Sequence, residues 1–199
     1  MIPATAPYVQ PSEAMKFRNY YFDAIGPYPM AVSTVVSAYH QARHNPPDWR
    51  EGWAGYGMRY GSDFGISAVN ISARYGLAEA LQEDTMYYSC GCKGVGRRLL
   101  HAVISTAIAR RGADGHEVFG LPGMVAPYIG PMTAVSLWYP SRYGAKDAFR
   151  MGNYGLLDYA IGNIGLEFIP GLFHPKPTSW IRRWHLDNRH AARMGESAP

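Results

Sequence analysis

Two adjacent carboxylates and a histidine lie in the middle of the chain, and these residue types can transfer protons. Glu83 and Asp84 close one helical segment, and His101 lies in the next, beyond a glycine-rich turn at residues 91–96. If the two helices form a hairpin, these side chains meet at its mouth, where they can act as general acids and bases. One hypothesis is therefore an enzyme with Glu83 and Asp84 as its carboxylates and His101 as its base.

The same segment also has a structural interpretation. Arg97 and Arg98 open the second helix, so they can face Glu83 and Asp84 across the mouth of the hairpin. A bidentate arginine–carboxylate pair fixes geometry whether or not anything reacts there, and ionisable networks also occur in purely structural settings. We favour this interpretation, in which the four side chains form a polar staple.

A second set of candidates consists of two histidines. His40 and His44 lie four residues apart, so a helix places both imidazoles on one face, where they can chelate a transition metal. Metalloprotease helices with this spacing carry a glutamate between the histidines, but here the intervening residues are Gln41, Ala42 and Arg43. The sequence favours a polar face near a helix C-terminus and keeps the two histidines as metal candidates.

The two cysteines, Cys90 and Cys92, are separated by one residue. They are a candidate for a strained disulfide, or for two ligands of a metal site completed by His101, although structural zinc usually takes four ligands. The cysteine count therefore leaves the redox compartment open. Spacings typical of a nucleophile elbow, a phosphate-binding loop or a dinucleotide fingerprint do not occur.

The C-terminal segment, residues 173–199, is basic and carries tryptophan. Trp180 and Trp184 fall on one helical face, with Arg182 and Arg183 between them. This arrangement suits a membrane–water interface or a groove on a protein partner. Folding back onto its own domain is the third possibility.

Helices must position all of these groups, because apolar residues recur at helical spacing and no convincing run of alternating strand residues is found. The clearest examples are residues 32–39, residues 100–107 with a basic last turn at Arg110-Arg111, and a final segment at about 147–168. Arg59 and Asp63 are also spaced to pair along one helix. We therefore predict an all-α bundle of about five helices, with an N-terminal arm at residues 1–22 that precedes a helical domain at 23–172.

Small residues also recur at helical spacing in the segment that begins near Trp53. Glycine inside a helix costs roughly 0.5–1 kcal/mol relative to alanine, so its recurrence predicts a second helix packed close to the backbone. The small residues are Gly57, Gly61, Gly65, Ala68, Ser72, Gly76 and Ala80.

Composition limits the classes of partner. The chain has 199 residues, of which 14% are aromatic and only 17% charged, and its formal net charge is +4. Much of that charge lies in the basic C-terminal segment, so the body is nearly neutral, which argues against a nucleic-acid binder. Residues 118–141 carry no charge and are long enough to cross a bilayer. Four prolines favour a buried, kinked core helix there over a membrane-inserted one.

Several motifs, taken in order, resemble an uncharacterised family of exported, envelope-associated bacterial proteins. The resemblance covers most of residues 47–170 and implies a helical body and an export signal upstream of Met1, but no activity. The N-terminus itself lacks a signal-peptide profile, which taken alone predicts a cytoplasmic product; the alternative is a mature or truncated form. The motifs are Pro47-x-Trp49, Gly55-Tyr56-Gly57-x-Arg59-Tyr60-Gly61, Glu83-Asp84-Thr85-x-Tyr87-Tyr88, Arg98-x-x-His101-Ala102, Arg110-Arg111 with Gly115 after it, Trp138-Tyr139-Pro140 and Glu167-Phe168-Ile169-Pro170.

Three functions follow from these patterns. The favoured one is a non-enzymatic structural or accessory subunit of the cell envelope, held against a membrane or within a larger assembly. The second is a metal-dependent or acid–base enzyme with its site at residues 83–101. The third is a lipid- or cofactor-binding bundle in which His40, His44 or His101 faces an apolar cavity. The sequence identifies neither a cofactor nor a substrate.

Overall fold

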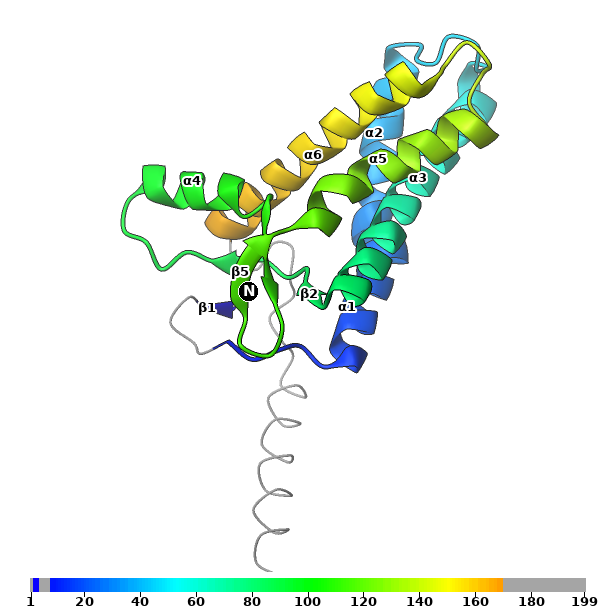
Figure 1. The fold of residues 1–199 in the computed structure, drawn as a ribbon. Coiled ribbons are helices and arrows are strands. Elements are labelled where there is room, and N and C mark those ends of the chain that lie inside the picture. The colour runs from blue at the N-terminus through cyan, green and yellow to red at the C-terminus, as the bar shows by residue number, and fades with distance from the viewer. Residues whose placement is uncertain (1, 4–7, 170–199) are drawn as a thin grey trace, which may run out of the picture.

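The computed structural model describes residues 2–3 and 8–169. The predicted C-terminal contact residues Trp180, Arg182, Arg183 and Trp184 lie outside the described residues. A compact helical bundle, as predicted, makes up most of the described chain (Figure 1). Its helices are α1 (Glu13–Ile25), α2 (Pro27–Ala42), α3 (Gly52–Leu81), α4 (Val95–Ile104), α5 (Leu121–Leu137) and α6 (Ala145–Phe168).

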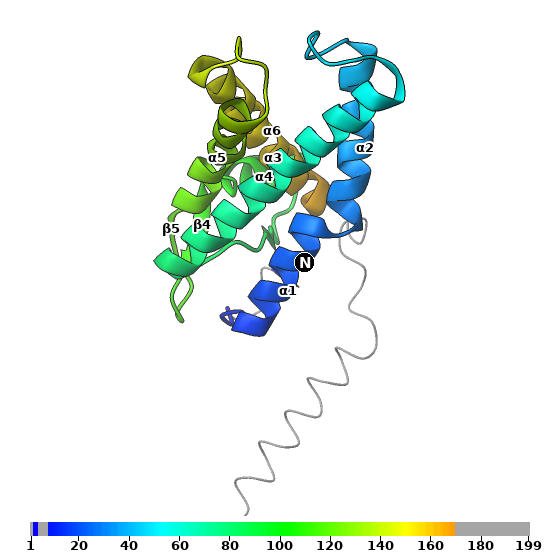
Figure 2. The ribbon, with the colours of Figure 1, turned by 90° about the vertical axis from the view of Figure 1, so that its right-hand side faces the viewer.

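Helices α2, α3, α5 and α6 form an elongated body, here called the helical arm. The long helix α3 packs against α1, α2 and α5, and α6 packs against α5 and α4. Two loops, residues 43–51 and 138–144, lie at the same end of the arm, as both views show (Figures 1 and 2). Arg142 Nε and Asp48 Oδ2, one from each loop, are 2.9 Å apart. These loops and the first turns of α6, up to residue 150, are called the tip.

The opposite end of the molecule contains strands that the sequence analysis did not predict. Strand β4 (Ile108–Arg111) pairs antiparallel with β2 (Glu83–Asp84) and with β5 (His116–Phe119), and β1 (Ile2–Pro3) pairs parallel with β3 (Tyr88–Ser89). We call these strands and α4, together with α1 and the last turns of α3 and α6, the sheet end. The prediction of a helix through Arg110-Arg111 is wrong there, because Gly112 and Gly115 adopt φ values of 71° and 65° that turn the chain into a hairpin.

The predicted hairpin of two helices around residues 83–101 is also wrong. Gln82 adopts a left-handed conformation, φ 56°, and ends α3. Glu83 and Asp84 then form β2 instead of closing the helix. As a result, α3 and α4 are separated by two short strands, and α4 packs on α6 instead.

Small residues do form the contacts between helices, but the predicted glycine stripe of α3 is not among them. A Cβ atom added at Gly130 of α5 would collide with the Ile66 carbonyl of α3, and one added at Gly152 of α6 would collide with the Tyr128 ring. By contrast, a Cβ added at Gly57 or Gly61 would meet no other part of the described chain within 4 Å. The close approach expected at α3 therefore occurs through glycines of α5 and α6.

Candidate functional site

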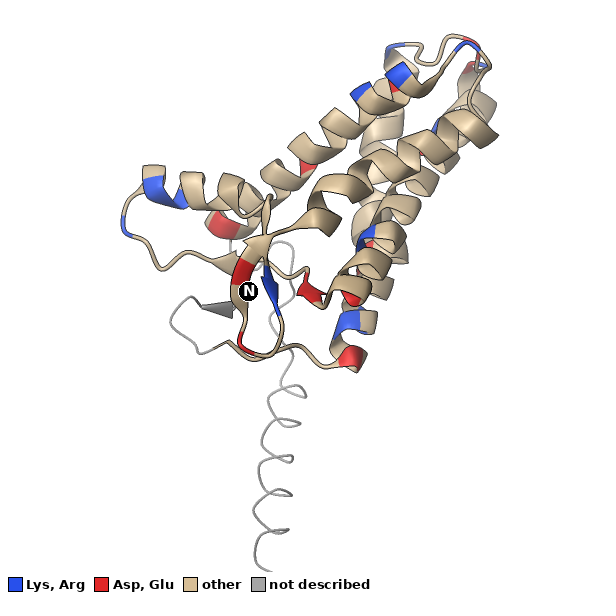
Figure 3. Ribbon diagram, viewed as in Figure 1, with Lys and Arg blue, Asp and Glu red and all other residues tan. Residues whose placement is uncertain are grey.

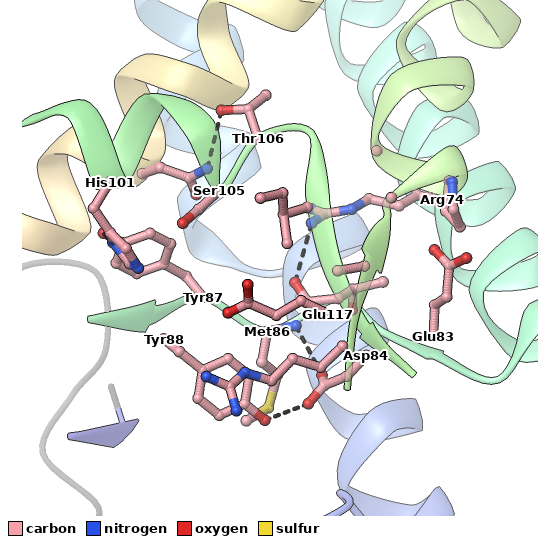
Figure 4. Close-up of a pocket in the computed structure, with 18 residues that line it drawn as sticks. Arg74, Glu83, Asp84, Met86, Tyr87, Tyr88, His101, Ser105, Thr106 and Glu117 are labelled. Carbon is pink, nitrogen blue, oxygen red and sulfur yellow. Dashed lines mark hydrogen bonds between the residues drawn. The ribbon is translucent and has the colours of Figure 1, made fainter. Parts of the chain in front are cut away.

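A small polar pocket lies at the sheet end, with a cavity volume of about 70 Å³. Its wall includes the three predicted catalytic candidates, Glu83, Asp84 and His101, together with Tyr87 and Tyr88 (Figure 4). The fold thus brings together residues that the sequence analysis grouped, although by a sheet and not by a helix hairpin. Their catalytic role stays a prediction.

The two adjacent carboxylates are held within the sheet. Glu83 is 2% exposed and forms an ion pair with Arg111, its partner in the β2–β4 register. Asp84 accepts hydrogen bonds from the Tyr88 hydroxyl and from the Met86 N–H, the latter at 2.9 Å. Burial, and then the neighbouring Asp84 carboxylate, raise the pKa of Tyr88, so this tyrosine stays a proton donor.

The predicted polar staple therefore has different partners. Arg97 is exposed, and Arg98 lies beside Glu167 of α6, with Nε 2.7 Å from Oε1. The carboxylates of β2 meet arginines of β4 because a strand follows α4 where the sequence analysis extended the helix. The ion pairs of this region differ from the predicted ones: Glu83 with Arg111 joins β2 to β4, and Arg98 with Glu167 joins α4 to α6.

Glu167 belongs to this site but was not among the predicted catalytic candidates. It is 1% exposed and accepts hydrogen bonds from Arg98, from the Tyr87 hydroxyl at 2.7 Å and from the Cys90 N–H at 3.0 Å. Burial opposes its ionisation, but these hydrogen bonds outweigh burial and lower its pKa. The available signal was an isolated carboxylate in the otherwise uncharged last two turns of an apolar helix.

His101 belongs to the same network. Its Nδ1 lies 3.3 Å from the Tyr87 hydroxyl, which in turn donates to Glu167. Burial, followed by the hydrogen bond to Glu167, raises the pKa of Tyr87, so the tyrosine keeps its proton. His101 therefore reaches a carboxylate through a tyrosine, and that carboxylate is Glu167, not the predicted Glu83 or Asp84.

The two cysteines form a disulfide with each other. The sequence predicted either this disulfide or a metal site that the two cysteines would share with His101. Bonded sulfurs are not thiolate ligands, so the metal alternative is not supported. The turn instead contributes its backbone, through the Cys90 N–H that binds Glu167.

The metal candidates His40 and His44 each lie beside a different carboxylate. His40 Nδ1 is 3.2 Å from Asp63 Oδ2, and His44 Nδ1 is 2.9 Å from Glu51 Oε1. The described part of the chain holds no group of three side chains placed to bind a metal ion. The two histidines therefore form separate polar contacts at the end of α2.

Arg59 does not pair with Asp63 as its spacing predicted. Its side chain is completely buried and turns back to the loop after α2, where it donates to the carbonyls of Asn45, Pro46 and Arg50 at 2.9–3.1 Å. Asp63 instead accepts from Ser37 of α2 at 2.8 Å. Arg59 thus fixes the loop between α2 and α3, and Asp63 links the two helices.

The helical arm places small residues inside and large apolar residues outside. Apart from Trp49, the buried hydrophobic residues among those described are all alanines. Large apolar side chains are exposed on every helix of the arm, including Val35 at 70%, Trp53 at 90% and Leu137 at 74%. This is the reverse of the usual distribution in a water-soluble domain.

Helix α2 shows the reversal most clearly. Its predicted apolar spacing is present, but Ser33 and Ser37 are buried while Val32, Val35 and Tyr39 are exposed. Helix α4 behaves similarly: Ala102 is buried and Leu99, Leu100, Val103 and Ile104 are exposed. The apolar stripes that sequence periodicity finds are therefore outer surfaces.

Charged residues gather at the two ends of the molecule, and the stretch between them is largely uncharged (Figure 3). Neither α2 nor α5 contains lysine, arginine, aspartate or glutamate. Two charged residues that do lie partway along the arm, Arg59 and Asp63, have side chains that are 0% and 12% exposed. Asp158 of α6, which lies near Tyr28 at the start of α2, is the exposed exception.

An apolar groove of about 410 Å³ runs between α5 and α6 on this surface. Its walls are formed mainly by Met124, Tyr128, Met132 and Phe149. None of His40, His44 and His101 lines it, so a groove-bound cofactor would not meet the predicted histidines.

Within the described residues, no helix has the length and apolar character needed to cross a membrane. No family model, curated protein or solved structure matches the chain.

Proposed function

We propose that this protein is a non-enzymatic structural subunit of the cell envelope that works against a lipid membrane. In this proposal, the sides of several helices contact lipid, rather than one helix spanning the bilayer. The observation that carries it is the distribution in the helical arm, where alanine, serine, glycine and proline lie inside and large apolar side chains lie outside.

The physical reason is that this distribution of side chains is unfavourable in water and favourable in lipid. In water, burial of apolar surface contributes about 25 cal/mol per Å², so an arm that buries serine and exposes valine gives up much of that stabilisation. In lipid, the hydrophobic effect does not drive helices together, and small residues form the interfaces because they let backbones approach. The contact of Gly130 with the Ile66 carbonyl is of this kind, and Gly152 makes room for the Tyr128 ring.

The position of the charges supports the same proposal. Charged side chains within an apolar medium are costly unless they are buried and paired. Arg59 and Asp63 satisfy this condition, because both bind other groups inside the arm. The remaining charged residues, apart from Asp158, lie toward the ends.

Flotation with vesicles of neutral phosphatidylcholine tests this function. The full chain should float with the vesicles and should need detergent to remain monodisperse in their absence. A triple variant, Val35→Gln with Leu100→Gln and Leu157→Gln, changes three exposed positions on three helices. It should float less and need less detergent. The matched control, Glu13→Gln with Arg97→Gln and Glu117→Gln, also changes three exposed positions and should float like the unaltered chain.

Two results would contradict the proposal. A chain that is monomeric in plain buffer and ignores vesicles has no need of lipid. The second is a defined assembly that forms without lipid and is lost in the Val35 triple variant. That result would mean that protein, and not lipid, covers the apolar surface.

The polar pocket supports a second candidate, an acid–base enzyme, because Glu83, Asp84 and His101 all line it. One oxygen of the buried Glu83 carboxylate, Oε2, has no hydrogen-bond partner within the described chain. Turnover of a supplied substrate that disappears in both Glu83→Gln and His101→Gln variants of normal fold would favour this candidate. Loss of folding in these variants, with no turnover by the unaltered chain, would favour the polar staple.

A further inference from the structure

The tip carries features that the rest of the arm lacks. Two loops distant in sequence are joined there by the ion pair between Arg142 and Asp48 and by contact of the Trp49 and Tyr139 rings, whose centroids are 5.1 Å apart. Trp53 lies in the first turn of α3, beside these loops, and is 90% exposed. The tip is therefore a single surface, rich in aromatic residues, that adjoins the apolar arm.

This surface has an excess of positive charge. Residues 43–51 and 138–150 contain five arginines and lysines against three carboxylates. Each of the carboxylates is in an ion pair: Asp48 with Arg142, Asp147 with Arg150, and Glu51 with His44 and Arg59. Pairing neutralises these acids together with Arg142 and Arg150, and it leaves the excess of positive charge on Arg43, Arg50 and Lys146.

The sheet end has no such excess. Counted over α1, the last turns of α3 and α6, and residues 83–119, it contains eight lysines and arginines and eight carboxylates. Burial of Glu83, Asp84 and Glu167 against their partners also keeps part of this charge from the surface. The two ends of the arm are thus electrically different, although both are polar.

An aromatic row begins beside the tip and runs along α3. Trp53, Tyr56, Tyr60 and Phe64 follow one another with ring centroids 6.2–6.5 Å apart. Gly57 and Gly61, which lie among them in the sequence, are exposed and meet no packed neighbour. Trp and Tyr prefer the level of lipid head groups, where an apolar ring body and a polar edge are both accommodated.

From these observations we propose that the tip lies at the head-group level of a bilayer that contains anionic phospholipid. The inference rests on the proposed function and names the lipid class and the end of the arm that meets it. The excess arginines and lysines attract anionic head groups, Trp53 and Tyr56 lie at the boundary, and the uncharged middle of the arm extends toward the acyl chains. The sheet end has no excess of positive charge, so anionic head groups do not attract it in the same way.

The test compares vesicles of phosphatidylcholine with and without phosphatidylglycerol. The tip variant is Arg43→Gln with Lys146→Gln, and the matched control is Lys93→Gln with Arg97→Gln, which removes the same charge from exposed positions at the sheet end. The unaltered chain should bind the anionic vesicles more tightly. The tip variant should lose this preference by about tenfold, and the control by less than twofold.

A second measurement locates the tip. Brominated acyl chains quench tryptophan fluorescence at short range, so quenching of the full chain should fall when Trp53 is replaced by Phe. Equal binding to both kinds of vesicle, an equal loss in tip variant and control, or unchanged quenching in the Trp53→Phe variant would overturn the orientation. Binding to neutral vesicles would then still support the proposed function, whereas failure to bind either kind overturns both.

Discussion

At the sheet end, Glu83, Asp84 and Glu167 are buried, and each is bound by an arginine or a tyrosine. In the helical arm the inward side chains are mostly alanine, serine, glycine and proline, and the apolar side chains face outward. The first region is organised by charge-assisted hydrogen bonds, which are strong where water is excluded. The second is organised by close backbone approach.

This difference indicates what each region requires from its surroundings. The sheet end satisfies most of its buried polar groups internally. The arm leaves its apolar surface for something else to cover, and its helices rely on fit between small residues. Substitutions should therefore act through lost hydrogen bonds in polar clusters and through steric collision in the arm, and the following four predictions separate these effects.

The largest effect is expected where a polar cluster lies inside the arm. Replacing Arg59 by Met leaves the carbonyls of Asn45, Pro46 and Arg50 without their donor. The free energy of unfolding should fall by about 3–5 kcal/mol, as measured by denaturant titration in the detergent or buffer that keeps the unaltered chain monomeric. Arg43→Met, at an exposed position, should change it by less than about 0.5 kcal/mol. Similar losses in both variants would show that Arg59 is not a structural centre.

The second-largest loss of stability is expected at Glu167. Glu167→Gln keeps the shape but removes the charge bound by Arg98, Tyr87 and Cys90. Because Arg98 is about a third exposed, we expect a loss of about 2–4 kcal/mol and not more. The exposed Glu117→Gln serves as the matched control in the same denaturant titration. If both glutamates behave alike, the sheet end is not held by Glu167.

A pair of glycine substitutions tests the packing of the arm. Gly130→Ala places a methyl group against the Ile66 carbonyl and the Asn70 side chain, so we expect a loss of about 1–3 kcal/mol. Gly57→Ala faces open space and should stabilise the helix by roughly 0.5–1 kcal/mol. Thermal unfolding of both variants measures the contrast. Equal effects at the two sites would mean that Gly130 is not needed for the close packing of α5 against α3.

The smallest effect is on pH dependence. The pKa of Glu167 is lowered in the folded protein, so on acidification the unfolded chain, with a glutamate pKa of about 4.3, takes up the proton first. The stabilisation is present above that pH and is lost as pH falls through the folded value. The stability difference between the unaltered chain and Glu167→Gln should therefore shrink below about pH 4. A constant difference from neutral to acidic pH would contradict this account.

Parts of this structure could be predicted from the sequence, because they depend on local spacing. Val32, Val35, Val36 and Tyr39 recur with the helical period, and they do lie on α2. Glu83, Asp84 and His101 were grouped by nearness in the chain, and they do line one pocket. The strand at Ile108–Arg111 was missed because its arginines also fit a helix end, and its true partner lies in another segment.

What the sequence by itself determined was the helical content, the scarcity of charge and the presence of small residues at helical spacing, since each is a property of neighbours along the chain. Which side of each helix faces inward was decided only by the tertiary structure. Periodicity is the same whether valine or serine points inside, and the choice depends on the contacts between Ser37 and Asp63 and between Gly130 and Ile66. The burial of Glu167 likewise required Arg98 and Tyr87, which are distant in the chain and meet it only in the folded protein.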